Sequence, residues 1–221
     1  MKIKDSNKLF FCSDTHFRHV NVPKFDKSPW WSDEAKRLNE LLKNSKKTGM
    51  SERDYTNIRN QEYAELQKCI EAQDEAIISN WNSTVDPDDT VYHLGDVTFS
   101  KDEKTILNIL DRLNGNIILI NGNHDQSVHK NKRVRNRFQM IRDYMEIQVD
   151  LQRITMFHYP IHEWNQSHRG AWMLHGHTHI YDDYDPKFKR CNVGIMNWDY
   201  KPVSYNQLQI FMADKEYKLH H

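Results

Sequence analysis

Five short clusters of histidine, aspartate and asparagine stand out because each lies at or near the end of an apolar run. They are Asp14-Thr15-His16, Gly95-Asp96, Asn121-Gly122-Asn123-His124-Asp125, His158 and His175-Gly176-His177-Thr178-His179. Taken singly, Gly-Asp and Asn-Gly are ordinary turn sequences. Three imidazoles at alternate positions have no comparable structural purpose, and clustered histidines usually bind metal.

Together the clusters supply candidate metal ligands that include no thiolate. They are Asp14, His16, Asp96, Asn123, His158, His177 and His179. This set is too large for one tetrahedral zinc and too rich in nitrogen for calcium or an all-oxygen magnesium site. Two transition metals that share a bridging carboxylate fit it best. Because two metals roughly 3.5 to 4 Å apart clamp the attacking and leaving oxygens in phosphoryl displacement, the chemistry points to phosphate esters.

The segments between the clusters predict the elements that position them. Apolar runs predict strands at 9–13, 90–94, 117–120, 145–149, 153–157, 171–174, 192–194 and 207–212. Amphipathic spacing predicts helices at 32–43, 57–80 and 101–113. Strands whose carboxyl ends carry functional residues, with helices between the early ones, indicate an α/β or mixed α/β sandwich.

Length and composition favour one intracellular domain. The chain has 221 residues and equal numbers of basic and acidic side chains, 31 of each, so no global field recruits nucleic acid or a membrane. The three cysteines form no disulfide framework, and we find no leader and no run of about 20 apolar residues, which favours the cytoplasm. We expect a single domain over 1–221 with a helical insert at about 24–80. His220 and His221 resemble a purification tag and carry no prediction.

In their order along the chain, the clusters resemble the motifs of the calcineurin-like metallophosphoesterases, DxH, GD, GNHD, H and GHxH. The resemblance spans residues 9 to about 204, and the opening Asp14-Thr15-His16-Phe17 is similar to a compact bacterial and phage branch that begins DTHFxH. It implies an α/β fold, a four-layer α/β/β/α sandwich of two mixed β-sheets flanked by helices, with two metals at the strand ends.

The resemblance also implies a role for each motif residue. Asp14, His16 and His179 would hold one metal, Asn123, His158 and His177 the other, and Asp96 would bridge them. A metal-bound hydroxide would attack the phosphorus. His124 would protonate the leaving group or stabilise the transition state, with Asp125 orienting its imidazole. Mn²⁺ is the expected metal, with Fe, Zn, Ni and Co as alternatives.

Positions that depart from the branch, or lie beside its motifs, suggest substrate contacts. Arg18 stands where the branch commonly has glycine, and Met196 where it has an acidic residue. The Arg18 guanidinium would suit a substrate phosphate, although a solvated surface arginine is the alternative. His19 and His162 are further candidates for the substrate cleft. The basic stretch from Lys130 to Arg142 would suit a polyanion or form a solvated helix face.

The leading hypothesis is therefore a metal-dependent hydrolase of phosphomonoesters or phosphodiesters. Its substrate would be a small molecule, a nucleotide or a nucleic acid, and no membrane partner is expected. A nuclease or a cyclic-nucleotide phosphodiesterase is a variant of the same chemistry. The rival class is a non-catalytic metal-binding scaffold, but such a protein would have no need of His124.

Overall fold

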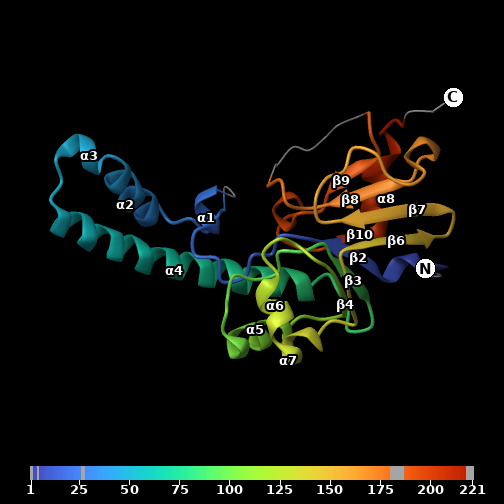
Figure 1. The fold of residues 1–221 in the computed structure, drawn as a ribbon, viewed down its shortest axis with the longest axis horizontal. Coiled ribbons are helices and arrows are strands. Elements are labelled where there is room, and N and C mark those ends of the chain that lie inside the picture. Colours follow the sequence, from blue (N-terminus) through green and yellow to red (C-terminus); the bar gives the residue numbers. More distant parts are fainter. Residues whose placement is uncertain (1, 4, 26–27, 180–186, 218–221) are drawn as a thin grey trace. The chain divides into compact units, whose positions relative to one another are not determined.

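The computed structural model describes residues 2–3, 5–25, 28–179 and 187–217, so the terminal His220 and His221 lie outside the described residues. The chain forms two compact units (Figure 1). Residues 1–16 and 77–221 form the main unit, and residues 17–76 form the helical unit. The helical unit overlaps the insert predicted at 24–80, while the single-domain organisation stays a prediction.

Two mixed sheets make up the main unit. The first has the order β10-β2-β3-β4-β5, in which β10 is antiparallel to β2 and the other neighbours are parallel. Its strands are β2 (Leu9–Cys12), β3 (Thr90–His93), β4 (Asn116–Ile120), β5 (Met140–Arg142) and β10 (Val203–Ser204). The second has the order β1-β6-β7-β8-β9, in which the β6–β7 hairpin is antiparallel and the other neighbours are parallel. Its strands are β1 (Lys2–Ile3), β6 (Tyr144–Val149), β7 (Gln152–Phe157), β8 (Trp172–His175) and β9 (Arg190–Asn192).

One hydrophobic core lies between the two sheets. Phe11 and Tyr92 of the first sheet stack at 5.5 Å between ring centroids, and Leu174 of the second sheet belongs to the same cluster. Because side chains alternate along a strand, His93 faces the other side of β3. There it stacks on Trp81, near the end of α4 (Glu52–Asn82). The first sheet is thus covered on both faces, as its nearly continuous apolar strands require.

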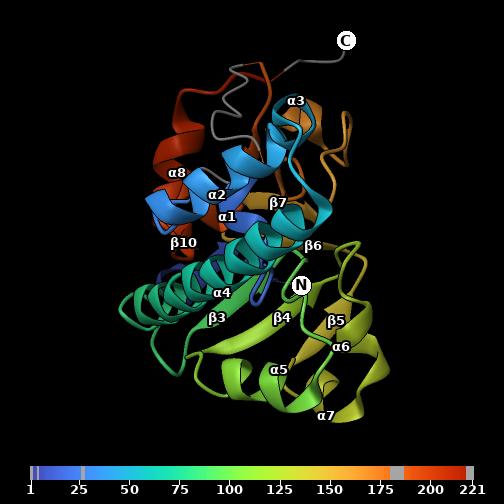
Figure 2. The same cartoon turned by 90° about the vertical axis from the view of Figure 1, so that its left-hand side faces the viewer.

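Short helices lie beside β4 and β5, as Figures 1 and 2 show. They are α5 (Glu103–Leu110), α6 (Gln126–Lys130) and α7 (Lys132–Arg135). Asp102 caps α5 by accepting the Thr105 amide at 2.8 Å, and Asn131 caps α7 in the same way. The predicted fold class is confirmed: the protein is mixed α/β, with two mixed sheets flanked by helices. Single-turn 3₁₀ helices lie at Ser6–Lys8, Ser167–Arg169 and Ile195–Asn197.

The strand predicted at 207–212 is wrong, because this segment lies in helix α8 (Tyr205–Ala213). Ser204 accepts the Gln207 amide at 3.2 Å, and the Gln207 side chain accepts the Ser204 amide at 2.9 Å, which completes a capping box. Leu208 and Met212, four residues apart, then face the core between the sheets. A short apolar run does not by itself distinguish a helix from a strand, whereas the cap does.

The helical unit contains α1 (Val22–Phe25), α2 (Asp33–Lys43), α3 (Ser45–Thr48) and the first part of α4. Ser32 caps α2 by accepting the Ala35 amide at 3.1 Å, so α2 begins where the sequence predicts. Leu66 and Cys69 of α4 pack on Ala35, which holds the two helices side by side. Between α2 and α4 the chain forms the single turn of α3, and its residues are exposed or partly exposed. Among the described residues, no helix is long and apolar enough to cross a membrane.

Candidate metal centre

The first two motifs are held in register because hydrogen bonding between β2 and β3 continues past the ends of both strands. The Asp14 amide donates to the Gly95 carbonyl at 2.9 Å, and the His16 amide donates to the Asp96 carbonyl at 3.1 Å. The two carboxylates therefore emerge side by side from neighbouring parallel strands. The expectation that strand ends bring these motifs together is correct.

Ser13 joins this edge to the second sheet. Its amide donates to the Val193 carbonyl at 3.0 Å, and the Val193 amide donates to the His175 carbonyl at 2.8 Å. The Gly176 amide in turn donates to the His158 carbonyl at 2.9 Å. The carboxyl ends of β7 and β8 are thus fixed beside the end of β2, and motifs more than 140 residues apart along the chain converge on one place.

Most of the predicted ligands have a backbone conformation that L-residues rarely adopt. Positive φ angles of 46° to 70° occur at Asp14, His16, Asp96, His177 and His179. Each such angle costs of order 1 kcal/mol or more and persists only where the surroundings enforce it. Strain of this kind concentrates at functional sites, and here it lies at the residues that carry the candidate ligand atoms.

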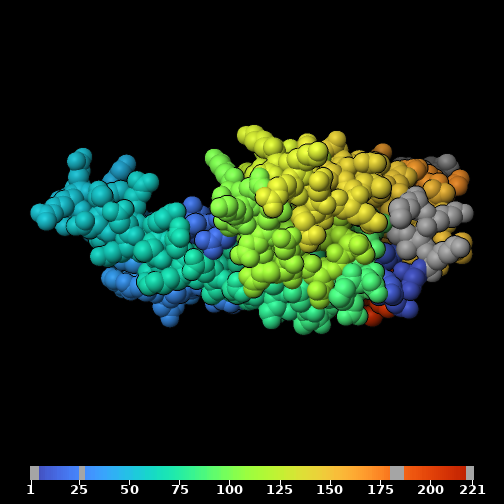
Figure 3. All heavy atoms as spheres, turned by 90° about the horizontal axis from the view of Figure 1, so that it is seen from below, coloured from blue at the N-terminus to red at the C-terminus, as the bar shows by residue number. Residues whose placement is uncertain are grey.

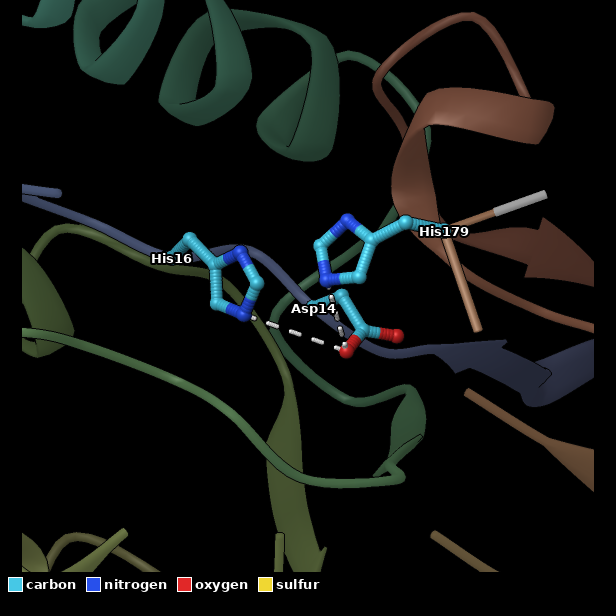
Figure 4. A group of neighbouring side chains, drawn as sticks. All are labelled: Asp14, His16 and His179. Carbon is cyan, nitrogen blue, oxygen red and sulfur yellow. Dashed lines mark ion pairs between the residues drawn. The ribbon is translucent and has the colours of Figure 1, made fainter. Parts of the chain in front are cut away.

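The first ligand group consists of Asp14, His16 and His179 (Figure 4). Asp14 Oδ1 lies 3.9 Å from the Nε2 atoms of both His16 and His179, and the two imidazoles stack at 4.8 Å. Oδ2 is held by the Ser13 hydroxyl at 2.6 Å and the His177 amide at 3.0 Å, which aims Oδ1 at the two rings. Asp14 and His16 are buried, whereas His179 is partly exposed.

The second group consists of Asp14, Asp96 and His158, all buried. His158 Nδ1 lies 2.7 Å from the Leu94 carbonyl oxygen, so Nδ1 donates, and Nε2 is the ring atom that could offer a lone pair to a metal. That Nε2 atom lies 2.9 Å from Asn123 Oδ1 and 3.7 Å from Asp96 Oδ2. Lone-pair atoms thus face one another inside the protein, an arrangement that a cation between them stabilises.

Asp96 belongs to the second group and also faces the His16 ring of the first group. Its Oδ2 is 3.3 Å from His16 Nε2, while its Oδ1 accepts the His124 amide at 2.8 Å. Burial disfavours the charged carboxylate, but the hydrogen bonds from His16 and His124 and the nearby His158 outweigh it and lower the pKa of Asp96 to about 2. A carboxylate that stays ionised between two groups of nitrogen ligands has the position that a bridging ligand requires.

His177 does not belong to either group through its ring. The imidazole lies 5.1 Å from that of His158 and 4.6 Å from the Tyr159 ring. The backbone amide of His177 contacts the site by donating a hydrogen bond to the Asp14 carboxylate at 3.0 Å. Burial and the neighbouring His158 lower the pKa of His177, so the ring is favoured in the neutral form that a metal ligand needs.

The role predicted for Asp125, orienting the imidazole of His124, stays a prediction. The buried Asp125 carboxylate accepts the backbone amides of Asp96 at 2.9 Å, Val97 at 2.9 Å and Gly122 at 2.8 Å. Burial raises the pKa of Asp125, opposed by these hydrogen bonds. His124 is exposed, and its ring lies 4.5 Å from that of Phe99. The spacing of residues in the sequence does not show that backbone amides bind the Asp125 carboxylate.

Two motif glycines are needed because the backbone passes so close to the ligands. A Cβ atom at Gly122 would meet the backbone nitrogen and carboxylate of Asp96. One at Gly176 would meet the Ser13 hydroxyl and the Asp14 carboxylate. Neither clash can be relieved without moving a candidate ligand, which explains why glycine precedes Asn123 and His177.

The structure does not bring the predicted substrate residues into either ligand group. Arg18 belongs to the helical unit, where its guanidinium lies 3.5 Å from Glu71 and its amide donates to the Asp74 carboxylate at 3.2 Å. His19 also belongs to that unit. His162 lines a separate cavity of about 60 Å³ in the main unit, and its side chain is 74% exposed. Their roles in substrate binding stay predictions.

Thr15 and His93 are buried polar residues that are not predicted metal ligands. They support the Gly95-Asp96 motif. The Thr15 hydroxyl donates to the Val97 carbonyl at 2.9 Å and lies 3.0 Å from His93 Nε2. His93 Nδ1 accepts the Gly95 amide at 3.2 Å. Burial lowers the pKa of His93 to about 3, so the ring is neutral. His93 is a hydrogen-bonded strand histidine, as its place in an apolar run suggests, and Thr15 would be hard to identify from spacing alone.

Two mixed sheets with aspartate, histidine and asparagine gathered at their strand ends define an α/β protein with a candidate metal centre. The chain belongs to the calcineurin-like phosphoesterase superfamily, whose domain matches residues 73–210. That match includes every motif from Gly95-Asp96 onward. Members of this superfamily generally bind divalent metals, and the two ligand groups suit such ions.

Relatives extend the likeness over most of the chain. An uncharacterized protein of Methanocaldococcus jannaschii is 29% identical over 203 residues, which cover 89% of this chain and 86% of the relative. The crystal structure of a protein of unknown function from Aquifex aeolicus shares the fold with a TM-score of 0.59 at 22% identity, over 92% of this chain and 98% of that one. The structure of YfcE, a phosphoesterase from E. coli, aligns with a TM-score of 0.36 at 16% identity, over 89% and 81% of the two chains, which is too low to establish a common fold.

Proposed function

We propose that the chain is a hydrolase of phosphate esters that works with two divalent metal ions. The observation that carries the proposal is the position of Asp96 Oδ2, which faces His16 Nε2 at 3.3 Å and His158 Nε2 at 3.7 Å. Two ions held by these groups would activate water and offset the charge of the phosphoryl group. Mn²⁺ is the proposed metal, because the carboxylate and amide oxygens suit it and the set includes no thiolate that would favour a softer ion.

The chain's own residues supply the remaining chemistry. Asp14, His16 and His179 would hold one ion, and Asn123, His158 and His177 the other, with Asp96 between them. His124 would give a proton to the leaving oxygen or hydrogen-bond to the transition state, because the residue is exposed and its backbone amide binds Asp96 at 2.8 Å. The exposed position also favours an enzyme over a metal-binding scaffold. The three cysteines are free and buried, which suits a reducing compartment, and we propose the cytoplasm.

Metal content and hydrolysis test the proposal together. Protein purified in Mn²⁺ should contain about two ions per chain, and chelation should abolish hydrolysis of 4-nitrophenyl phosphate or bis(4-nitrophenyl) phosphate until Mn²⁺ is returned. Asp96→Asn should lose both metal and activity, whereas the exposed Asp88→Asn should keep both. One ion per chain, or hydrolysis that survives chelation, would show that the dinuclear proposal is wrong. Monoesters, diesters, cyclic nucleotides and short nucleic acids then separate the substrate classes.

A further inference from the structure

A cavity of about 440 Å³ opens beside the candidate metal centre in the main unit. It lies among the loop after β3, helix α5, the loop after β4 and helix α6, and it shares only Asn123 and His124 with the residues assigned above. Helices α5, α6 and α7, in green to yellow-green, form one exposed face of the main unit (Figure 3). Because His124 lines this cavity, a group bound in the cavity would lie next to His124 during the reaction.

The wall of the cavity nearest the metal centre is apolar. The Phe99 ring lies 4.5 Å from the His124 ring and 5.2 Å edge-on from the His16 ring, so it links the candidate proton donor to a candidate metal ligand. Ile106 of α5 adds a buried aliphatic surface to the same wall. An apolar or aromatic ring of a substrate would pack here, since stacking on a phenylalanine needs no matched hydrogen bonds.

The outer part of the cavity is positive. Lys101 and Lys130 are both exposed, and neither forms an ion pair within the described parts of the chain. Glu103 also lines the cavity. One of its carboxylate oxygens accepts a hydrogen bond from the Asn131 side-chain amide, and the other accepts one from the Arg133 guanidinium at 2.9 Å. Its charge is thus balanced, and the two lysines leave a local excess of positive charge in a chain whose net charge is zero.

We propose that this cavity binds the leaving group of the phosphate ester, and that this leaving group carries both a ring and a second anionic group such as a phosphate. The inference rests on the proposed function. In hydrolysis a water molecule gives one proton to the solvent and its oxygen bonds to phosphorus. The bond from phosphorus to the leaving oxygen breaks, and that oxygen takes a proton from His124, which regains one from the solvent. The group that departs next to His124 lies against Phe99, and its second anion reaches Lys101 and Lys130. A nucleotide has this combination of ring and anion.

Two synthetic diesters that differ only in the leaving group test the inference. Methyl 4-(phosphonomethyl)phenyl phosphate carries the second anion, and methyl 4-ethylphenyl phosphate does not. The Mn²⁺-loaded full chain should have kcat/KM about five to ten times higher for the anionic diester, as two partly exposed ion pairs would give. Lys101→Ala/Lys130→Ala should remove that preference by lowering kcat/KM for the anionic diester to about the value for the neutral one.

A matched variant controls for overall charge. Lys104→Ala/Lys132→Ala removes two exposed lysines from α5 and α7 that do not line the cavity, and it should keep the preference. If the wild type shows no preference, or if the two double variants behave alike, the cavity does not bind an anionic leaving group. Because all four lysines are exposed, both variants should fold, which far-UV circular dichroism verifies.

A binding measurement separates failure of this inference from failure of the proposed function. The product analogue 4-(phosphonomethyl)phenol is titrated into the full chain after chelation, so that its phosphonate cannot bind a metal ion. Saturable NMR shifts at Phe99 and His124 that vanish in Lys101→Ala/Lys130→Ala support the cavity even if neither diester is hydrolysed. Absence of those shifts, with the diesters hydrolysed equally, overturns the inference and leaves the hydrolase proposal standing.

Discussion

Asp125 Oδ2 accepts the backbone amide of Asp96 at 2.9 Å and that of Gly122 at 2.8 Å. Oδ1 of the same carboxylate accepts the Val97 amide at 2.9 Å. One buried side chain thereby ties the loop after β3, which carries the central carboxylate, to the loop after β4, which carries Asn123 and His124. Asp125, the last residue of the Gly-Asn-His-Asp motif, thus positions Asp96 by accepting the backbone amide of that residue.

Asp125→Asn should weaken both the fold and the metal centre. The substituted amide has one acceptor oxygen, so at least one buried amide donor loses its partner, at a cost of about 1 to 3 kcal/mol. Metal affinity should fall by about 10- to 100-fold, because the Asp96 loop is less well held. Urea unfolding and calorimetric Mn²⁺ titration measure the two effects. Asp88→Asn, in an exposed turn, is the control, and an Asp125→Asn protein that matched it would contradict this role.

Gly176→Ala should disturb the first ligand group by steric contact alone, since Gly176 has no positive φ. The added methyl meets the Ser13 hydroxyl and the Asp14 carboxylate, so Asp14 must move. We expect Mn²⁺ affinity to fall by about tenfold or more, measured by titration. Gly170→Ala is the control, because its φ of 79° makes it strained but its Cβ would have no neighbour nearer than 3.6 Å. That variant should lose stability and keep its metal affinity.

The sequence predicts the ligand-bearing strand ends well, since each of β2, β3, β4 and β8 is an apolar run that ends in a polar cluster. Carboxyl ends of neighbouring parallel strands meet at one edge, and this places Asp14 beside Asp96 without knowledge of distant contacts. The N-caps of helices can be predicted equally well, as Ser32 shows for α2. The caps and the strand ends depend on residues only a few positions apart.

Contacts between distant loops are what the sequence does not reveal. The Leu94 carbonyl that fixes the tautomer of His158 is a backbone atom, so no side chain marks it. Phe99 reads as an ordinary apolar residue after the second motif, yet it lies between His16 and His124. The error at α8 has another origin, because the capping signal of Ser204 and Gln207 is present in the sequence but its apolar run also suits a strand.

The buried neutral His93 predicts how stability depends on pH. Its folded pKa of about 3 lies below the unfolded value of about 6.5, so the unfolded chain binds more protons as the pH falls. Stability should therefore decrease on acidification, by about 1.4 kcal/mol between about pH 7.5 and about pH 5.5. Urea unfolding of metal-free protein measures the decrease, and His93→Gln should reduce it by that amount. His162→Gln, with a side chain 74% exposed, should not.

His124→Ala should lower turnover while leaving the metal in place. The substitution keeps the backbone amide that donates to Asp96 Oδ1, so the ligand loop is retained and metal content should match the wild type. Loss of a positioned proton donor should lower kcat by about 10²- to 10⁴-fold.

The identity of the leaving group separates a proton donor from a merely structural residue. An alkyl ester, whose alkoxide leaves poorly without a proton, should lose far more rate in His124→Ala than a 4-nitrophenyl ester, whose phenolate leaves unaided. His129→Ala serves as the control, because His129 is exposed and its ring lies 2.9 Å from the Asn121 side-chain oxygen. Equal losses for the two esters would mean that His124 does not donate the proton, and loss of metal would mean that it supports the ligands instead.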